Sequence, residues 1–79
     1  MQILAEIAMY PLSREYDEPI LEFIRRLRSH HNISVTPGET STVIRGEYEV
    51  VMDILTSEMR IGLDGHDRTV FLVKILNTV

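Results

Sequence analysis

The spacing of apolar residues along this chain switches between the two-residue period of a strand and the 3.6-residue period of a helix. Residues 2–10 and 68–76 are expected to be strands, and Pro11 stops the first of them. A helix is expected to begin at Asp17 or Glu18, where a carboxylate can cap its first turn. Its apolar positions, at helical spacing, are Ile20, Phe23, Ile24 and Leu27.

The first helix is expected to end near Asn32. Basic side chains fill the turns before that point, where cations suit the negative end of the helix dipole. They are Arg25, Arg26, Arg28, His30 and His31. The simplest interpretation of the arginines is a solvated helix end.

The middle of the chain has the pattern of a hairpin followed by a second helix. Residues 33–36 and 41–45 alternate like strands, and Pro37-Gly38 supplies a turn between them. Gly46 is expected to end the second of these strands. The next helix opens over residues 47–49, with two carboxylates at its positive end. Its apolar positions are Tyr48, Val51, Met52, Leu55 and Met59, and residues 62–67 form a turn-rich break.

The element order is therefore strand, helix, strand, strand, helix, strand. This order is typical of the α+β ferredoxin-like βαββαβ fold. In that fold a four-stranded antiparallel sheet has the order 4-1-3-2, and two helices cover one face. With 79 residues, residues 1–79 are expected to form a single domain, because a chain of this length has no room for a second core.

Composition excludes several classes of protein. The chain has no cysteine, which removes disulfides, thiolate metal sites and cysteine nucleophiles. Its net charge of −4 argues against broad attraction to nucleic acid or to anionic lipid. No basic segment precedes the first apolar run, and no apolar stretch approaches the ~20 residues of a membrane span. The cytoplasm is the expected location, with no membrane and no nucleic-acid partner.

The first and last strands are apolar on both faces. In the first, Ile3, Ala5 and Ile7 alternate with Leu4 and Ala8. An antiparallel sheet that helices cover on one face should instead alternate apolar with polar residues. A second copy of the chain is the simplest cover for the open face. The sequence therefore predicts a homo-oligomer.

Glu6 and Lys74 interrupt these two strands. They fall in matching alternation classes, and the expected topology makes the strands neighbours, so the two side chains should meet on one face. One interpretation is an ion pair shielded at a subunit interface. The other is a carboxylate that recognises a polar group of a ligand in an otherwise apolar site. The sequence leaves both open.

Catalytic and metal-binding patterns are absent from the sequence. The run Thr40-Ser41-Thr42 leads towards a helix start, which could line a pocket, although hydroxyls on strands are ordinary. His30, His31 and His66 lack the spacing of metal ligands. No serine nucleophile motif and no glycine-rich phosphate loop is present. We expect no enzyme activity, no metal and no cofactor.

Taken in order, several short motifs resemble the YkoF-like thiamine-binding family. They are Glu6-Ile7-Ala8-Met9-Tyr10-Pro11-Leu12, Pro19-Ile20 with Phe23-Ile24, residues 40–52 (TSTVIRGEYEVVM) and Val70-Phe71-Leu72-Val73-Lys74-Ile75. The resemblance implies a ferredoxin-like fold, dimers and tetramers formed through the sheets, and binding of thiamine or its hydroxymethylpyrimidine part without turnover. Thr40 departs from the pattern, since many members carry methionine there, and the chain ends with its last strand.

The resemblance also suggests how a ligand is held. Glu6 would accept a hydrogen bond from the exocyclic amine or a protonated ring nitrogen of an aminopyrimidine. Ser41 and Thr42 would satisfy other polar groups, and Tyr10 would offer an aromatic face, with Met9 and Met52 adapting the shape of the pocket. Lys74 would orient Glu6 but would repel a cationic thiazolium, which favours the bare pyrimidine.

Three other functions share this topology. An ACT-like regulatory domain would carry glycine in the loop after the first strand, and residues 11–17 contain none. An acylphosphatase-like enzyme needs a glycine-bearing phosphate loop followed by an arginine; Arg14 is present, but the glycines are not. The third alternative is an assembly module that binds no ligand.

Overall fold

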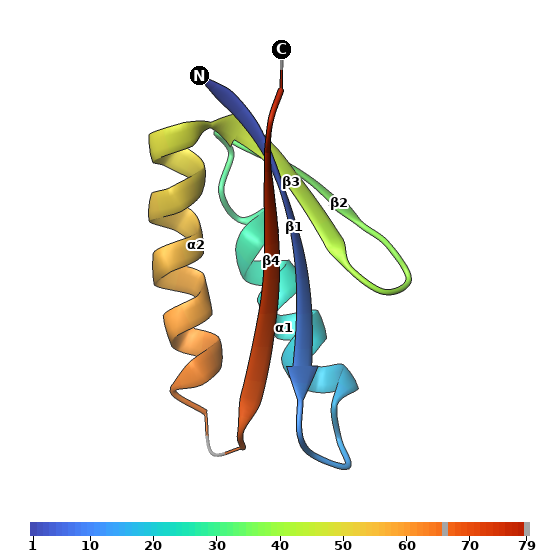
Figure 1. The fold of residues 1–79 in the computed structure, drawn as a ribbon. Coiled ribbons are helices and arrows are strands. Elements are labelled where there is room, and N and C mark those ends of the chain that lie inside the picture. The colour runs from blue at the N-terminus through green and yellow to red at the C-terminus, as the bar shows by residue number, and fades with distance from the viewer. Residues whose placement is uncertain (66, 79) are drawn as a thin grey trace.

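A computed structural model describes residues 1–65 and 67–78. The chain folds as β1 (Gln2–Pro11), α1 (Asp17–Arg28), β2 (Ser34–Pro37), β3 (Thr42–Glu47), α2 (Tyr48–Leu63) and β4 (Thr69–Asn77). The strands form one antiparallel sheet in the order β2-β3-β1-β4. This is the predicted βαββαβ order, so the ferredoxin-like fold class is confirmed. In Figure 1, α1 passes behind the sheet and α2 stands beside β4.

The core lies between one face of the sheet and the two helices. From β1, the residues on this face are Ile3, Ala5, Ile7 and Met9, all of which are buried. Phe23 and Leu27 pack against them from α1, and α2 contributes Val51, Ile54 and Leu55. The centre of the Phe23 ring lies 5.1 Å from that of Phe71 on β4, and the two rings are tilted relative to each other, as is common in aromatic pairs. Burial of this apolar surface is the main force that holds the helices on the sheet.

Helix α1 is shorter than the sequence predicted. It ends at Arg28, and the Ser29 hydroxyl donates a hydrogen bond to the carbonyl oxygen of Arg26 at 2.6 Å. The prediction that His30 and His31 occupy its last turns is therefore wrong. Side-chain bonding by serine gives the backbone an alternative to a further helical turn. Arg26 also departs from the expected solvated helix end, because its Nε atom lies 3.6 Å from Oε2 of the buried Glu58.

Two glycines expected to end or break elements lie inside them. Gly46 pairs with Ile3 within β3, which continues to Glu47. A Cβ atom at position 46 would meet Cγ2 of Ile33 at 3.1 Å and Cγ2 of Val51 at 3.2 Å. Glycine is therefore needed there for a close approach, not for a stop. Gly62 lies within α2, so the break begins later than predicted, and His66 is outside the described residues.

Pro11 is the last residue of β1 rather than the residue that follows it. The backbone N–H of Leu12 donates to the carbonyl oxygen of Arg68, so even-numbered residues of β1 bond to β4 and odd-numbered ones point towards β3. Pro11 therefore faces the β3 side, where pairing has already ended at Ile7 and Thr42. The missing N–H of Pro11 costs no ladder hydrogen bond there.

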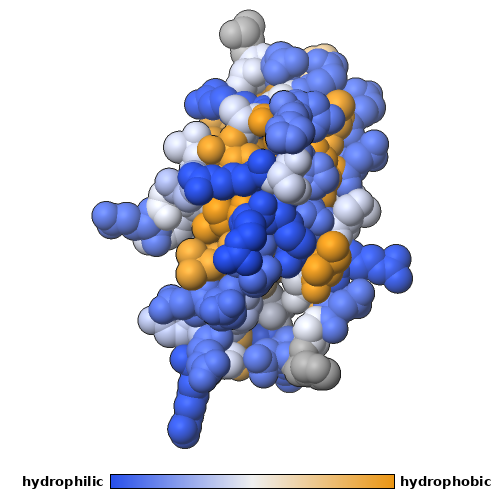
Figure 2. Space-filling view, turned by 180° about the vertical axis from the view of Figure 1, so that it is seen from behind, coloured by the Kyte–Doolittle hydropathy of each residue, from blue (hydrophilic) through white to orange (hydrophobic). Residues whose placement is uncertain are grey.

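The two sides of the sheet differ in cover. Figure 2 shows the side on which α1 lies, where hydrophilic side chains are interspersed with separate hydrophobic areas. The opposite face of β1 and β4 carries large apolar side chains with no helix over them. They are Tyr10, Val70, Leu72 and Leu76, which are 49–57% exposed. Among residues 1–65 and 67–78, no helix has the length and apolar character needed to cross a membrane.

Candidate functional site

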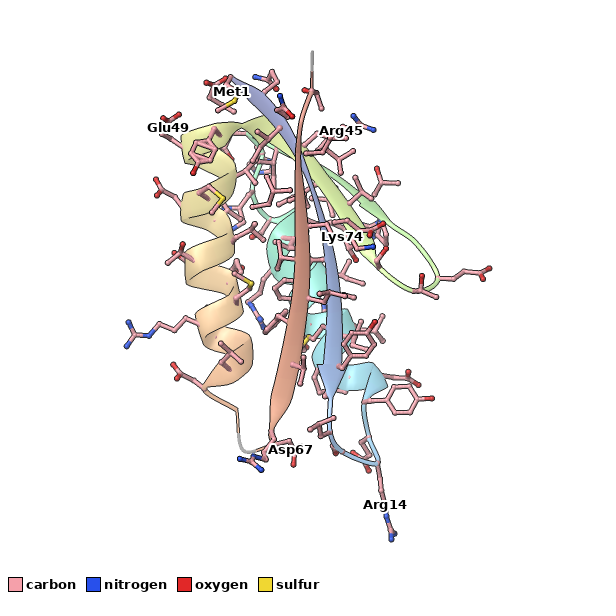
Figure 3. The ribbon with its side chains drawn as sticks, in the orientation of Figure 1. Met1, Arg14, Arg45, Glu49, Asp67 and Lys74 are labelled. Atoms are coloured by element: carbon pink, nitrogen blue, oxygen red, sulfur yellow. The ribbon has the colours of Figure 1, made fainter. Side chains whose placement is uncertain are left out.

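Glu6 and Lys74 lie directly opposite each other on β1 and β4. The Lys74 Nζ atom is 3.6 Å from Oε1 of Glu6, which confirms the predicted contact. Figure 3 shows the Lys74 side chain on the side of β4 that faces away from α2. The Glu6 side chain is 39% exposed, whereas that of Lys74 is 73% exposed. The carboxylate is thus the less exposed partner of the pair.

A cavity of about 160 Å³ opens beside this ion pair on the uncovered face of the sheet. Of the five residues proposed from the sequence, four line it: Glu6, Tyr10, Ser41 and Lys74. They combine a carboxylate, an ammonium, a hydroxyl and an aromatic ring. Pockets for drug-sized ligands measure about 300–1,000 Å³. The volume here therefore suits a small polar molecule, or one ring of a larger molecule.

Thr42, the fifth proposed residue, is on the other face of the sheet. Its side chain is buried, at 5% exposure, because side chains alternate along β3 and position 42 shares its face with the core residue Ile44. Thr42 lines a separate cavity of about 70 Å³ together with Ile7 and Phe23. Ser41 also borders this smaller cavity, so of the two hydroxyl residues only Ser41 reaches the cavity beside Glu6.

Ala8, Thr40 and Leu72 also line the larger cavity, although the sequence did not single them out as site residues. Ala8 and Leu72 face each other across β1 and β4. Their alternation class is that of Glu6 and Lys74, so the period of the strands could have identified them. Thr40 has no such signal, since it lies in the turn after β2, and the path of a turn is not fixed by period.

Two groups with shifted pKa values lie away from this cavity, at the start of the chain. A hydrogen bond from the Met1 ammonium to the Glu47 carboxylate, 2.6 Å long, lowers the pKa of Glu47 and raises the pKa of the terminal amine. Gln2 donates a second hydrogen bond to Glu47 at 2.9 Å. This group fixes the first residue of β1 beside the end of β3, and both charges are open to solvent.

A second charged cluster joins the helices. Glu58 on α2 is 6% exposed, and its Oε2 atom lies 3.6 Å from Nε of Arg26 and 3.6 Å from Nε2 of His30. Arg26 also lies over the ring of Phe23, with its guanidinium carbon 5.9 Å from the ring centre. Across the described part of the chain, no three His, Asp or Glu side chains gather closely enough to hold a metal ion.

The fold is shared with solved structures of other proteins. A Thermotoga maritima protein, assigned provisionally to thiamine biosynthesis or salvage, superposes with a TM-score of 0.85 over 99% of this chain and 85% of its own, at 21% identity. A Streptococcus pneumoniae protein gives 0.90 at 22% identity, over 100% of this chain and 89% of its own. A hypothetical protein of Methanocaldococcus jannascii gives 0.84 at 19% identity, over 99% and 81%.

These similarities establish the fold. They do not extend to function, because sequence identity is near one residue in five and one fold hosts many functions. No protein-family model matches the sequence, and no curated protein matches it either. The function must therefore be argued from the site.

Proposed function

We propose that this chain is a non-catalytic binding protein for an aminopyrimidine, either hydroxymethylpyrimidine itself or the same ring within thiamine. The observation that carries the proposal is the Glu6 carboxylate, paired with Lys74, at a small cavity that Tyr10 and Ser41 also line. The structural neighbour with a provisional role in thiamine metabolism supports the choice of ligand. In this proposal the protein works in the cytoplasm and binds its ligand without changing it.

Glu6 would select the ring by charge. A carboxylate accepts charge-assisted hydrogen bonds from an exocyclic amine or from a protonated ring nitrogen, and such bonds are stronger than neutral ones. Lys74 lies 3.6 Å from the Glu6 carboxylate, so its ammonium would offset part of that charge. Because Lys74 is cationic, the thiazolium of thiamine would have to extend away from it. The bare pyrimidine avoids this repulsion.

A second copy of the chain would cover the site. The uncovered face carries four large apolar side chains that are about half exposed, and the cavity opens on that same face. Monomeric proteins rarely leave extended apolar patches in water. A homo-oligomer formed through this face would exclude water from the carboxylate and strengthen its hydrogen bonds.

Calorimetric titration with hydroxymethylpyrimidine and with thiamine tests the binding proposal. We expect heat from at least one ligand, and an affinity at least 10-fold lower in Glu6→Gln, because a hydrogen bond to a charged group contributes about 1.5–3 kcal/mol. Glu49→Gln is the control, since this carboxylate lies on α2 and is exposed. No heat from either ligand at millimolar concentration contradicts the proposal and leaves an assembly module as the better account.

A further inference from the structure

The sheet has an opening where β3 stops alongside β1. Odd-numbered residues of β1 point their N–H and C=O groups towards β3, and the last pair joins Ile7 to Thr42. The next pair would join Met9 to Thr40. Thr40 instead lies in the turn after β2, where the N–H of Gly38 donates to the carbonyl oxygen of Ser41 at 2.7 Å. In Figure 1, β1 runs on beyond the tip of the β2–β3 hairpin.

Met9 consequently has two backbone groups without a partner. Its N–H and C=O point into the opening, and within residues 1–65 and 67–78 neither group forms a ladder or turn hydrogen bond. Residue 9 is nevertheless 9% exposed. Backbone groups at buried positions are paired in nearly all native proteins, and leaving them unpaired is unfavourable. The position is therefore suited to an external partner.

Cavities surround this opening on both sides of the sheet. Thr40 borders the cavity beside Glu6, the small cavity under α1, and a groove of about 420 Å³ that Tyr10, Tyr16 and Met9 also line. Tyr10 borders both the groove and the Glu6 cavity. A planar molecule at Thr40 would thus lie beside an aromatic ring, with its edge within the plane of the sheet.

The opening is too short for a peptide strand. Strand addition depends on several consecutive backbone pairs. On this side of β1 the next odd-numbered position is Pro11, which has no N–H. Pairing in the other direction is already taken by Thr42. One residue's donor and acceptor are available, which suits the edge of a small heterocycle.

We propose that the backbone N–H and C=O of Met9 bind the edge of a planar heterocycle that carries an acceptor nitrogen beside an amino group. The ligand takes the position that Thr40 would occupy in a longer ladder. The ring nitrogen accepts from the Met9 N–H, and one amino hydrogen is donated to the Met9 carbonyl. Glu6 then accepts from the second amino hydrogen or from a protonated ring nitrogen. This inference rests on the proposed function for the choice of aminopyrimidine.

Hydrogen exchange followed by NMR tests the pairing. In the free protein we expect fast exchange at the Met9 amide and slow exchange at Ala8, whose N–H faces β4. Saturating hydroxymethylpyrimidine should slow exchange at Met9 at least 10-fold more than at Ala8, which reports general stabilisation. Slow exchange at Met9 without ligand overturns the inference, because the group is then already paired, for example by another copy of the chain.

Two variants at position 9 separate the backbone from the side chain. Met9→Ala and Met9→Pro both remove the thioether, but only proline removes the N–H, and that N–H is not part of the ladder. We expect Met9→Pro to bind hydroxymethylpyrimidine at least 10-fold more weakly than Met9→Ala. If the proline variant does not fold, the exchange experiment decides alone.

The outcomes distinguish this inference from the proposed function. If hydroxymethylpyrimidine binds and Glu6→Gln abolishes binding, but Met9 exchange changes no more than that of Ala8, the proposed function stands and the edge pairing is wrong. If neither hydroxymethylpyrimidine nor thiamine gives heat, the proposed function is wrong. Cytosine, which has the same acceptor–donor edge, is then the probe. Protection of Met9 by cytosine supports the pairing, and its absence overturns it.

Discussion

Glu58 is a buried acidic residue whose partners come from a different part of the chain. Arg26 and His30 approach its carboxylate from α1 and the segment after it, and Arg26 also reaches the Glu58 carbonyl oxygen at 3.4 Å. A buried ion pair adds little stability over an apolar pair, but removing one member leaves an unpaired charge. Removing one member therefore destabilises the fold mainly because the remaining partner keeps an unpaired charge.

We expect Glu58→Ala to lower the free energy of unfolding by about 2–3 kcal/mol, measured by urea denaturation at neutral pH. The value lies below the usual range for a buried pair because the Arg26 side chain is 26% exposed and water can still reach it. Glu49→Ala, on the exposed side of the same helix, should change the free energy of unfolding by less than about 0.5 kcal/mol. Equal effects of the two substitutions would show that the cluster does not stabilise the contact between the helices.

Individual residues of the site were predictable where strand period decides their direction. The meeting of Glu6 and Lys74 follows from two alternation patterns and one topology, and the structure confirms it at 3.6 Å. Thr42 was assigned to the same site from the hydroxyl-rich run and the family resemblance, although the alternation of side chains along β3 places it on the core face. The Glu58 cluster had no sequence signal, because a long-range contact between helices depends on their packing.

At the scale of elements, the junction between β3 and α2 depends on the absence of a side chain. Gly46 lies where the first turns of α2 and the segment before β2 approach the strand, within van der Waals reach of Val51 and Ile33. Protein interiors are close-packed and adjust little to an added methyl group. The junction therefore tolerates glycine better than any larger residue.

We expect Gly46→Ala to lower the free energy of unfolding by about 1–2 kcal/mol, since the added Cβ forces two packed methyl groups apart. Gly65→Ala is the matched control, because a Cβ there would meet its nearest neighbour, the Gly62 carbonyl oxygen, at an ordinary 3.7 Å. Thermal and urea unfolding of both variants would measure the difference. A neutral Gly46→Ala would mean that α2 shifts easily on β3.

The order and type of all six elements were predictable from hydrophobic period, but several of their ends were not. Gly46 and Gly62 resemble stop signals in the sequence, yet each is inside an element where another side chain comes close. Helix α1 ends earlier than predicted for a different reason, because the Ser29 hydroxyl donates a hydrogen bond to the Arg26 carbonyl oxygen. Element ends are set by such local competition, which the period of apolar residues does not report.

At the scale of the whole molecule, exposed apolar side chains occur on both sides of the sheet. Leu21 on α1 is 56% exposed and stands on the helix side, where hydrophilic side chains predominate. Leu76 is 57% exposed, but it shares the uncovered face with Val70 and Leu72. Several apolar side chains on one face, here on either side of Lys74, support association more than a single exposed side chain does.

We expect Leu76→Asp to shift the protein towards a monomer of about 9.1 kDa, measured by sedimentation velocity. An unpaired carboxylate buried in an apolar interface is strongly unfavourable. Leu21 is about as exposed as Leu76, and Leu21→Asp should leave the sedimentation coefficient unchanged. A monomer for the unchanged chain at high micromolar concentration, or equal behaviour of both variants, would contradict the proposed oligomer.

Pro11 also limits how the hairpin can vary among related chains. If insertions lengthened β2 and β3, the Met9 and Thr40 backbones could form one more rung, but the following rung would lack its donor at Pro11. A longer hairpin could therefore add one backbone pair, at Met9, and no complete pair after it. Beyond position 9, this side of β1 therefore gains no complete backbone pair, whatever the length of the hairpin.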